Sequence, residues 1–154
     1  MRPKYVACDP ARCTGCRLCE FACALAKEGA FDLDLARIHV SRPTATLSLA
    51  VACRLCADAP CVRACPRSAL QVSPDDGVIE VIPSLCTGCG WCIEACDFGA
   101  ISLDRKSKSV VICDLCRDTG EPACVLGCPK EALSLKSAEA VAADSRDRVV
   151  ARET

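Results

Sequence analysis

CTGCGWCIEAC, residues 86–96, places four cysteines within eleven positions, and CTGCRLCEFAC, residues 13–23, repeats the same spacing. A wider version of the pattern follows each stretch, so the chain contains four cysteine quartets of two alternating types. Every quartet opens with C-x-x-C and closes with C-x-x-x-C, and both wider quartets end in Cys-Pro. This repetition indicates two duplicated pairs. The quartets are Cys13, Cys16, Cys19, Cys23; Cys53, Cys56, Cys61, Cys65; Cys86, Cys89, Cys92, Cys96; and Cys113, Cys116, Cys124, Cys128.

The composition of the chain shows what can fill its interior. A length of 154 residues suits one compact domain or two very small ones, and only five residues are aromatic while 17 are cysteine. We therefore expect the cysteines, with whatever they bind, to occupy the core. The net charge of −1 leaves no basic surface that would indicate a nucleic-acid partner.

The ends and the hydropathy of the chain indicate where the protein works. Its N-terminus, MRPKYVACDPARC, has no apolar run of the kind found in secretory signal peptides. No stretch of about eighteen apolar residues is present, so we expect no insertion into a membrane and a cytoplasmic location. An extracellular disulfide scaffold is disfavoured because the cysteine count is odd and the cysteines cluster as C-x-x-C.

Short runs of β-forming residues lie between the quartets. Where two runs flank a polar turn, as around Asp75-Asp76-Gly77 and the segment RKSK, we expect a β-hairpin. The residues that follow the third cysteine of a quartet, such as IEAC, are compatible with one short helix. The predicted strands are residues 69–73, 77–82, 100–104, 109–113, 36–41 and 46–52.

Two regions without cysteines offer additional surface. Residues 24–52 form a long insertion between the first two quartets, and an alanine-rich, charged tail begins near Ser137. The tail composition is compatible with a frayed helix and favours a solvated or disordered end. An arm that docks on a partner subunit is a further hypothesis for the tail.

The quartets indicate a particular class of metal site. Thiolates are soft ligands that suit zinc, copper(I) and iron–sulfur clusters. Structural zinc sites usually combine two separated cysteine or histidine pairs, whereas C-x-x-C-x-x-C is too compressed for one tetrahedral ion. The run C-x-x-C-x-x-C-x-x-x-C is the spacing of bacterial [4Fe–4S] ferredoxins, in which the fourth cysteine ligates the other cluster of a pair. Sixteen of the 17 cysteines therefore predict four [4Fe–4S] clusters, with Cys8 left over.

Three glycines within the narrow quartets, Gly15, Gly88 and Gly90, are predicted cofactor-binding residues. A backbone without Cβ can approach a cluster closely and direct its N–H groups at sulfur. Such hydrogen bonds contribute to the reduction potential.

Five other residues have a structural and a functional interpretation, and we favour the structural one for each. Cys8 is interpreted as a small buried strand residue rather than a labile ligand or a redox thiol. His39 is interpreted as a strand residue rather than a ligand, and Trp91 as a packing residue that shields a cluster. Arg54 and Arg117 are interpreted as surface charges rather than groups that tune a potential.

The segments CRLCADAPCVRACPRSAL, residues 53–70, and CDLCRDTGEPACVLGCPKEAL, residues 113–133, carry a family resemblance. They resemble the four-cluster iron–sulfur subunits of the dimethyl sulfoxide reductase and formate dehydrogenase families. Similar small proteins serve carbon monoxide dehydrogenase, hydrogenase and tungsten aldehyde oxidoreductase systems. The resemblance covers residues 5 to about 136.

The resemblance implies an α+β fold of two pseudo-duplicated ferredoxin-like modules, with short helices and β-hairpins around four clusters. Residues 1–30 with 107–136 would form the first module, residues 31–106 the second, and residues 137–154 the tail. Proline usually follows the last cysteine, but Ala24 and Asp97 stand there in quartets one and three.

The resemblance also implies that quartet one shares its clusters with quartet four, and quartet two with quartet three. We name the implied ligand groups sets A to D. Set A is Cys13, Cys16, Cys19 and Cys128; set B is Cys23, Cys113, Cys116 and Cys124; set C is Cys53, Cys56, Cys61 and Cys96; set D is Cys65, Cys86, Cys89 and Cys92.

Catalytic motifs are missing from the sequence. It has no Gly-rich nucleotide fingerprint, no P-loop and no recognisable nucleophile–base pair. With cysteine at every ligand position, we expect electron transfer without substrate turnover. A zinc-binding interaction module is disfavoured by the spacing, and a free polyferredoxin shuttle by the near-neutral charge.

By analogy with the family, the first choice of partner is a tungsten or molybdenum pterin oxidoreductase, acting on an aldehyde or formate. It would pass electrons through this chain to a flavin subunit or a ferredoxin. Carbon monoxide dehydrogenase or a hydrogenase is the second choice of partner. Several copies of the chain per complex are a further hypothesis, because each module would have a cluster near either end.

Overall fold

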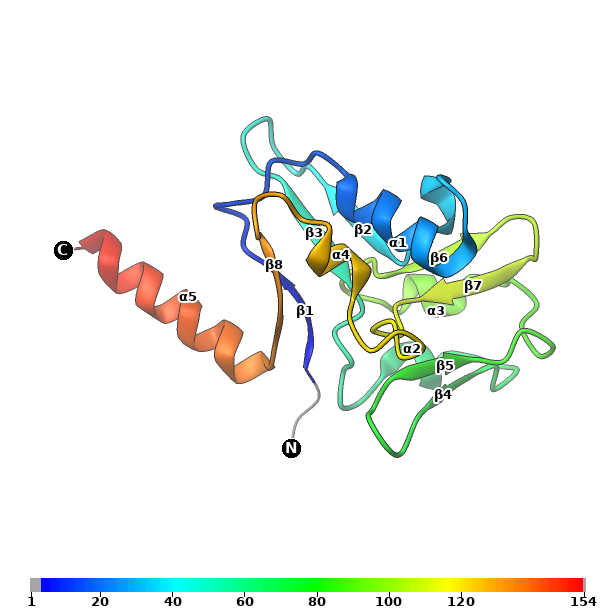
Figure 1. The fold of residues 1–154 in the computed structure, drawn as a ribbon. Coiled ribbons are helices and arrows are strands. Elements are labelled where there is room, and N and C mark those ends of the chain that lie inside the picture. Colours follow the sequence, from blue (N-terminus) through cyan, green and yellow to red (C-terminus); the bar gives the residue numbers. More distant parts are fainter. Residues whose placement is uncertain (1–3, 154) are drawn as a thin grey trace.

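The computed structural model describes residues 4–153, which contain short helices and four two-stranded antiparallel ribbons (Figure 1). This mixed α/β architecture agrees with the predicted class of fold. The strands are β1 (Tyr5–Cys8), β2 (Ile38–Ser41), β3 (Leu49–Ala52), β4 (Leu70–Val72), β5 (Ile79–Val81), β6 (Ile101–Asp104), β7 (Ser109–Ile112) and β8 (Leu133–Lys136). The helices are α1 (Leu18–Glu28), η1 (Leu33–Leu35, a 3-10 turn), α2 (Pro60–Arg63), α3 (Trp91–Glu94), α4 (Ala123–Leu126) and α5 (Ala138–Glu153).

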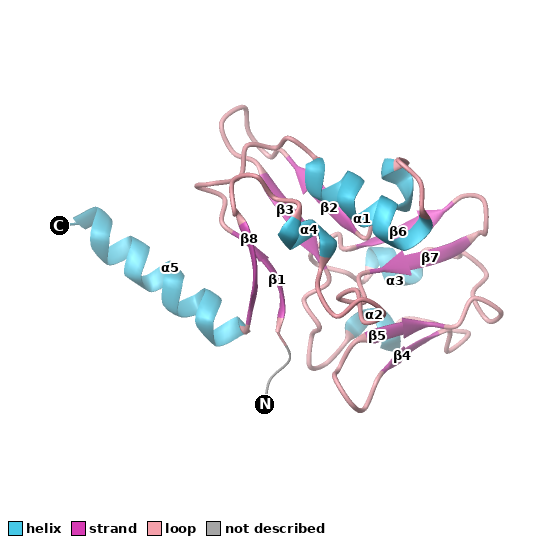
Figure 2. Ribbon diagram, in the orientation of Figure 1, coloured by secondary structure: helices cyan, strands magenta, loops and turns pink. Residues whose placement is uncertain are grey.

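The predicted strands all form, and they pair with their neighbours in the chain. The hairpins β4–β5 and β6–β7 are antiparallel (Figure 2), with Gly77 at positive φ in the first turn. Strands β2 and β3 also pair, so the insertion between quartets one and two folds back on itself. Local turn chemistry predicted the β4–β5 and β6–β7 ribbons. For β2 and β3 the strands were predicted, but not their pairing.

The fourth ribbon joins the two ends of the cysteine-containing region. Strand β1 pairs antiparallel with β8, with Ala7 opposite Ser134, and the N–H of Asp9 donates to the carbonyl of Ala132 at 2.7 Å. The sequence analysis did not predict β8. Its pairing partner lies more than a hundred residues away, so no local turn signal marks it.

Helix α1 is much longer than the short helix expected after a third cysteine. It spans 11 residues and ends at Gly29, which adopts a left-handed conformation and donates its N–H to the carbonyl of Leu25 at 3.0 Å. The segment from Ala24 to Glu28 consists of strong helix formers, so the helix continues past Cys23. Helix α3, in the matching position of quartet three, has four residues.

The tail is helical from Ala138 to Glu153 and extends away from the rest of the molecule (Figure 1). The tail is therefore an ordered helix, and most of its residues are exposed, which agrees with a solvated rather than a disordered end. Alanine has the highest helix propensity, and it recurs through the first half of this segment. An ion pair at 2.9 Å between Arg148 and Asp9, and a second between Lys136 and Asp144, join α5 to the body.

The core is built from small side chains and thiols. Its largest fully buried side chains are Ile38, Leu70 and Val78, and many of its other members are alanine or cysteine. One continuous apolar cluster runs through both predicted modules. The predicted boundary between residues 106 and 107 lies in the turn of the β6–β7 hairpin, and the division into two duplicated modules stays a prediction. Among the described helices, none is long and apolar enough to cross a membrane.

Candidate metal centres

The cysteines of set A come together from opposite ends of the chain. Cys13, Cys16, Cys19 and Cys128 line one cavity. Its remaining walls include Val40 of β2, Ala50 of β3 and Leu133 of β8. The β1–β8 ribbon explains this convergence, because it places the end of quartet four beside the start of quartet one.

The cysteines of set D line a second cavity. Cys65 contributes from the end of quartet two, while Cys86, Cys89 and Cys92 contribute from quartet three. Gly90, Thr87, Arg67 and the apolar side chains of Leu70 and Val110 complete the lining. Sets A and D are thus built alike, with three thiols from a narrow quartet and one from the end of a wide quartet.

The cysteines of set B lie within electrostatic range of one another. Burial raises the pKa of Cys124, and the neighbouring Cys113, Cys23 and Cys116 add to the rise. Burial also raises the pKa of Cys23, partly offset by a hydrogen bond from the Arg37 backbone, and Cys116 raises it further. Thiols in such surroundings stay protonated at neutral pH until a metal displaces the protons.

Set C shows the same pattern around Cys96. Burial raises the pKa of Cys61 to about 11, with smaller contributions from Cys53 and Cys96. Burial is also the main cause of the raised pKa of Cys53, to which Cys56 and Cys96 add. In the described part of the chain, no three His, Cys, Asp or Glu side chains converge tightly enough to hold a single metal ion.

Cysteines of different implied sets lie close enough to influence one another. Cys19 of set A adds to the raised pKa of Cys124 in set B, and burial raises the pKa of Cys113 to about 12 with help from Cys53 of set C. In the implied assignment, quartets two and three would each supply ligands to both set C and set D. These proximities favour the linear order A, B, C, D for the implied sets.

The last cysteine of each quartet accepts a backbone N–H. In three quartets the donor is the residue four positions later, but Cys23 accepts from Arg37, 14 positions later. Backbone donors suit thiolates that carry negative charge and influence the potential of a bound cluster. The other three pairs are Ala69 to Cys65 at 3.3 Å, Ala100 to Cys96 at 3.5 Å and Ala132 to Cys128 at 3.3 Å; the Arg37 to Cys23 distance is 3.3 Å.

The three predicted glycines all adopt positive φ: 69° at Gly15, 66° at Gly88 and 84° at Gly90. A Cβ on Gly15 would lie 2.7 Å from side-chain atoms of Arg42 and Ser48, while a Cβ on Gly88 would lie 2.7 Å from the carbonyl oxygen of Lys108. A Cβ on Gly90 would meet nothing within 4 Å. The glycines shape both narrow quartets, and their approach to a cofactor stays a prediction.

Cys8 and His39 take the strand positions that the sequence analysis favoured. Cys8 ends β1, accepts the N–H of Ala50 at 3.3 Å, and has its pKa raised to about 11, mainly by burial. His39 lies in β2, where burial lowers its pKa and its buried Nε2 has no hydrogen-bond partner among the described residues.

Trp91 differs from the interpretation given to it, whereas Arg54 and Arg117 are exposed, as expected for surface charges. Trp91 is 61% exposed, so its ring lies largely in solvent. The Arg54 guanidinium stacks on Phe98, 4.7 Å from its ring centroid, and on Tyr5 at 5.3 Å. Arg117 connects quartet four to the β4–β5 hairpin through ion pairs with Asp76 and Glu80.

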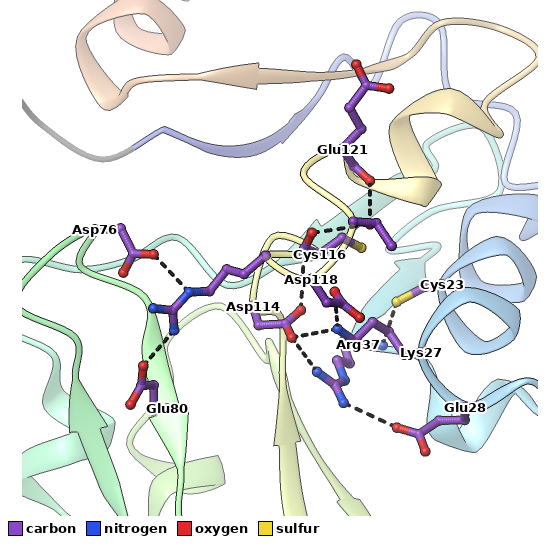
Figure 3. Close-up of polar contacts among 12 residues, drawn as sticks. Cys23, Lys27, Glu28, Arg37, Asp76, Glu80, Asp114, Cys116, Asp118 and Glu121 are labelled. Atoms are coloured by element: carbon purple, nitrogen blue, oxygen red, sulfur yellow. Dashed lines mark hydrogen bonds and ion pairs between the residues drawn. The ribbon is translucent and has the colours of Figure 1, made fainter.

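Sequence reasoning missed a polar network beside set B (Figure 3). Lys27 and Arg37 both contact the carboxylate of Asp114, which lies between Cys113 and Cys116. One signal for Lys27 was available. It follows Cys23 by four residues, and residues four apart share a face if the helix continues.

Comparisons with known proteins agree with this architecture. A family model described as a 4Fe-4S dicluster domain matches residues 44–138. YsaA of Escherichia coli K12, named for electron transport, is 40% identical over 149 residues, which cover 90% of this chain and 92% of YsaA. The electron transport protein HydN of the same organism is 35% identical over 154 residues, covering 84% of this chain and 86% of HydN.

A third relative is named as part of a complex. It is the polyferredoxin-like subunit of aliphatic sulfonate oxidoreductase from Pyrococcus furiosus, 39% identical over 124 residues that cover 80% of this chain and 70% of the relative. These matches span most of the chain. The chain therefore belongs to the 4Fe-4S dicluster family of iron–sulfur electron-transfer proteins.

Proposed function

We propose that this chain is an electron-transfer subunit that carries four [4Fe–4S] clusters, one on each of sets A to D. The observation that carries the proposal is the cavity lined by Cys13, Cys16, Cys19 and Cys128. Three neighbouring thiols meet a fourth from the far end of the chain, as the shared ligation of paired clusters requires.

The residues around each set fit an anionic sulfur ligand shell. All four donors in each set are cysteine, the softest ligand that proteins supply. Each last cysteine of a quartet accepts a backbone N–H, and apolar side chains such as Leu133 and Leu70 line the cavities of sets A and D. When bound, [4Fe–4S] clusters supply one-electron carriers whose potentials the protein sets.

The exposure of the cysteines supports a wire with two ends. Cys16 of set A and Cys89 of set D are exposed, whereas the other 15 cysteines are buried or partly buried. These two hold equivalent positions in the narrow quartets and belong to the outer members of the linear order. Electrons would enter and leave at these ends, while all four cysteines of set B are buried and those of set C are buried or partly buried.

The partner we propose is a tungsten or molybdenum pterin oxidoreductase for an aldehyde or formate, with a flavin subunit or a ferredoxin as acceptor. The Pyrococcus relative, named as a subunit of an oxidoreductase, supports a role within a complex. The alternatives are carbon monoxide dehydrogenase or hydrogenase as the partner, or a free shuttle. The choice among these partner enzymes rests on analogy at the level of the fold alone.

Elemental analysis of the complex, purified anaerobically from its own host, tests the proposal. We expect about sixteen irons per copy of this chain, after subtraction of the partner's share, because four cubanes hold four irons each. Tungsten or molybdenum would support the pterin partner, and nickel the alternative. A chain isolated alone, with zinc and little iron, would contradict the electron-transfer proposal.

A further inference from the structure

Two oppositely charged side chains are buried on helix α1, each beside a different cysteine set. Glu20 follows Cys19 of set A, and its side chain is 3% exposed. Lys27 follows Cys23 of set B by one helical turn, and its side chain is 8% exposed. Buried charges act over longer distances than surface charges because water screens them less.

Glu20 makes an ion pair and a hydrogen bond beside set A. Its carboxylate accepts the N–H of Val40 at 2.9 Å and pairs with the guanidinium of Arg17, whose side chain is about half exposed. Val40, whose N–H Glu20 accepts, lines the set A cavity. Because Glu20 is buried and directly follows Cys19, its carboxylate lies beside a thiol of set A.

Lys27 is held as a cation beside set B (Figure 3). Its Nζ lies 2.8 Å from Oδ2 of Asp114 and 2.8 Å from Oδ1 of Asp118. Burial alone would lower the pKa of Lys27, but hydrogen bonds to these two carboxylates outweigh burial and raise it. The ammonium is therefore charged at neutral pH.

A second cation, Arg37, belongs to the same group, which also contains the carboxylates of Asp114, Asp118 and Glu28. The guanidinium of Arg37 lies 2.9 Å from Oδ2 of Asp114 and 3.2 Å from Oε1 of Glu28, while its backbone N–H donates to Cys23. The charge of Arg37 lowers the pKa of Cys23, and that of Asp114 raises it. Asp114 lies between the two cations and accepts the N–H of Cys116 at 3.1 Å.

We propose that helix α1 acts as an electrostatic step, in which buried Glu20 lowers the reduction potential of the cluster on set A and buried Lys27 raises that of the cluster on set B. This inference rests on the proposed function, since it needs clusters on both sets. Each effect is that of one buried charge on the nearest set, since a negative charge disfavours an added electron and a positive charge favours it.

Redox titrations followed by electron paramagnetic resonance on the anaerobically purified protein test the step. Glu20→Gln keeps the size of the side chain and its acceptor for Val40 but removes the charge. We expect Glu20→Gln to raise the reduction potential of one component of the iron–sulfur signal. Lys27→Met should lower the reduction potential of another component. Each change should be about tenfold in the reduction equilibrium constant, or about 59 mV for a one-electron couple.

Three matched variants separate charge from packing. Lys27→Arg keeps the charge and should restore most of the wild-type potential. Lys106→Met removes the same charge from a side chain that is 82% exposed, and should shift each component less than a third as much. Cys16→Ser alters a set A ligand and identifies which component belongs to that set.

Other outcomes would overturn the step. Shifts of the same sign in Glu20→Gln and Lys27→Met, equal shifts of all components, or no shift would each contradict it. If the Lys27→Met protein loses iron, the Asp118→Asn variant is measured instead. Removal of that anion should raise the reduction potential of the set B component. A wild-type protein without iron–sulfur signals would instead contradict the proposed function.

Discussion

The two narrow quartets, residues 13–23 and 86–96, have identical spacing but different surroundings. In both, the glycine after the first cysteine has positive φ, and the cysteines contribute to a similar cavity. Helix α3 stops after four residues, whereas α1 runs on to Glu28. The N–H of Ala100 can therefore reach Cys96, but α1 continues past Cys23, which accepts from Arg37 of a distant segment.

The difference teaches that ligand spacing and ligand environment are encoded separately. The spacing C-x-x-C-x-x-C determines which thiols can meet. The residues after the last cysteine decide whether the helix continues, and the longer α1 brings Lys27 to Asp114. Two equivalent loops can thus present their cofactors with unlike charges.

The largest effect is expected when two cysteines of one set, taken from different quartets, are removed together. In the double variant Cys13→Ala with Cys128→Ala, we expect the loss of one cluster, about four irons of sixteen, because both residues belong to set A. If each quartet instead held its own cluster, two clusters and about eight irons would be lost. Iron analysis of the purified protein distinguishes the two results.

The matching experiment for quartet three removes two cysteines of set D. Cys86→Ala with Cys65→Ala should also remove about four irons, since both lie in set D. Cys8→Ala is the control for a cysteine outside the sets, and its iron content should equal that of the wild type. Loss of iron in the control would make Cys8 a ligand.

Replacing the glycines of the two narrow quartets by alanine should lower the stability of the protein by different amounts. Gly88→Ala should be the most damaging change, because its Cβ would lie 2.7 Å from the backbone carbonyl oxygen of Lys108. Gly15→Ala meets only side-chain atoms of Arg42 and Ser48, which can move, and Gly90→Ala meets no neighbour. We expect about 1–2 kcal/mol for Gly90→Ala from its positive φ alone, and progressively more for Gly15→Ala and Gly88→Ala. Anaerobic thermal melting measures the order, and a Gly90 variant as unstable as the Gly88 variant would contradict it.

A smaller effect is expected at the bridge between quartet four and the β4–β5 hairpin. Arg117 lies 2.9 Å from Asp76 and 2.6 Å from Glu80, but all three side chains are more than a third exposed. Arg117→Met should lower the melting temperature slightly at low ionic strength. The difference should vanish at about 1 M salt, because ions screen exposed pairs; a difference that persists would indicate lost packing instead.

The smallest effect on the clusters is expected from the tail. Deletion of residues 138–153 removes the ion pair from Arg148 to Asp9 but no cysteine of any set. Iron content and redox titrations should therefore match the full chain. If the tail is a docking arm, the deletion should abolish co-purification with the partner enzyme; a deletion that still co-purifies would contradict that role.

Much of the fold followed from local pattern, and the remainder depended on distant contacts. The hairpins β4–β5 and β6–β7 were predicted because polar turns separate alternating runs. Strand β8 was missed because its partner β1 is at the other end of the cysteine-containing region. Helix α1 is longer than predicted because residues 24–28 have high helix propensity, which the cysteine spacing does not reflect.

By itself, the sequence determined the number of thiols, their spacing and the class of metal group they suit, because ligand softness and loop length are local properties. It also marked the glycines whose backbone conformation the narrow quartets need. Only the tertiary structure decided that Cys128 meets Cys13 and that Lys27 and Glu20 are buried beside different sets. Convergence and burial depend on which distant segments pack together, and no local pattern encodes that packing.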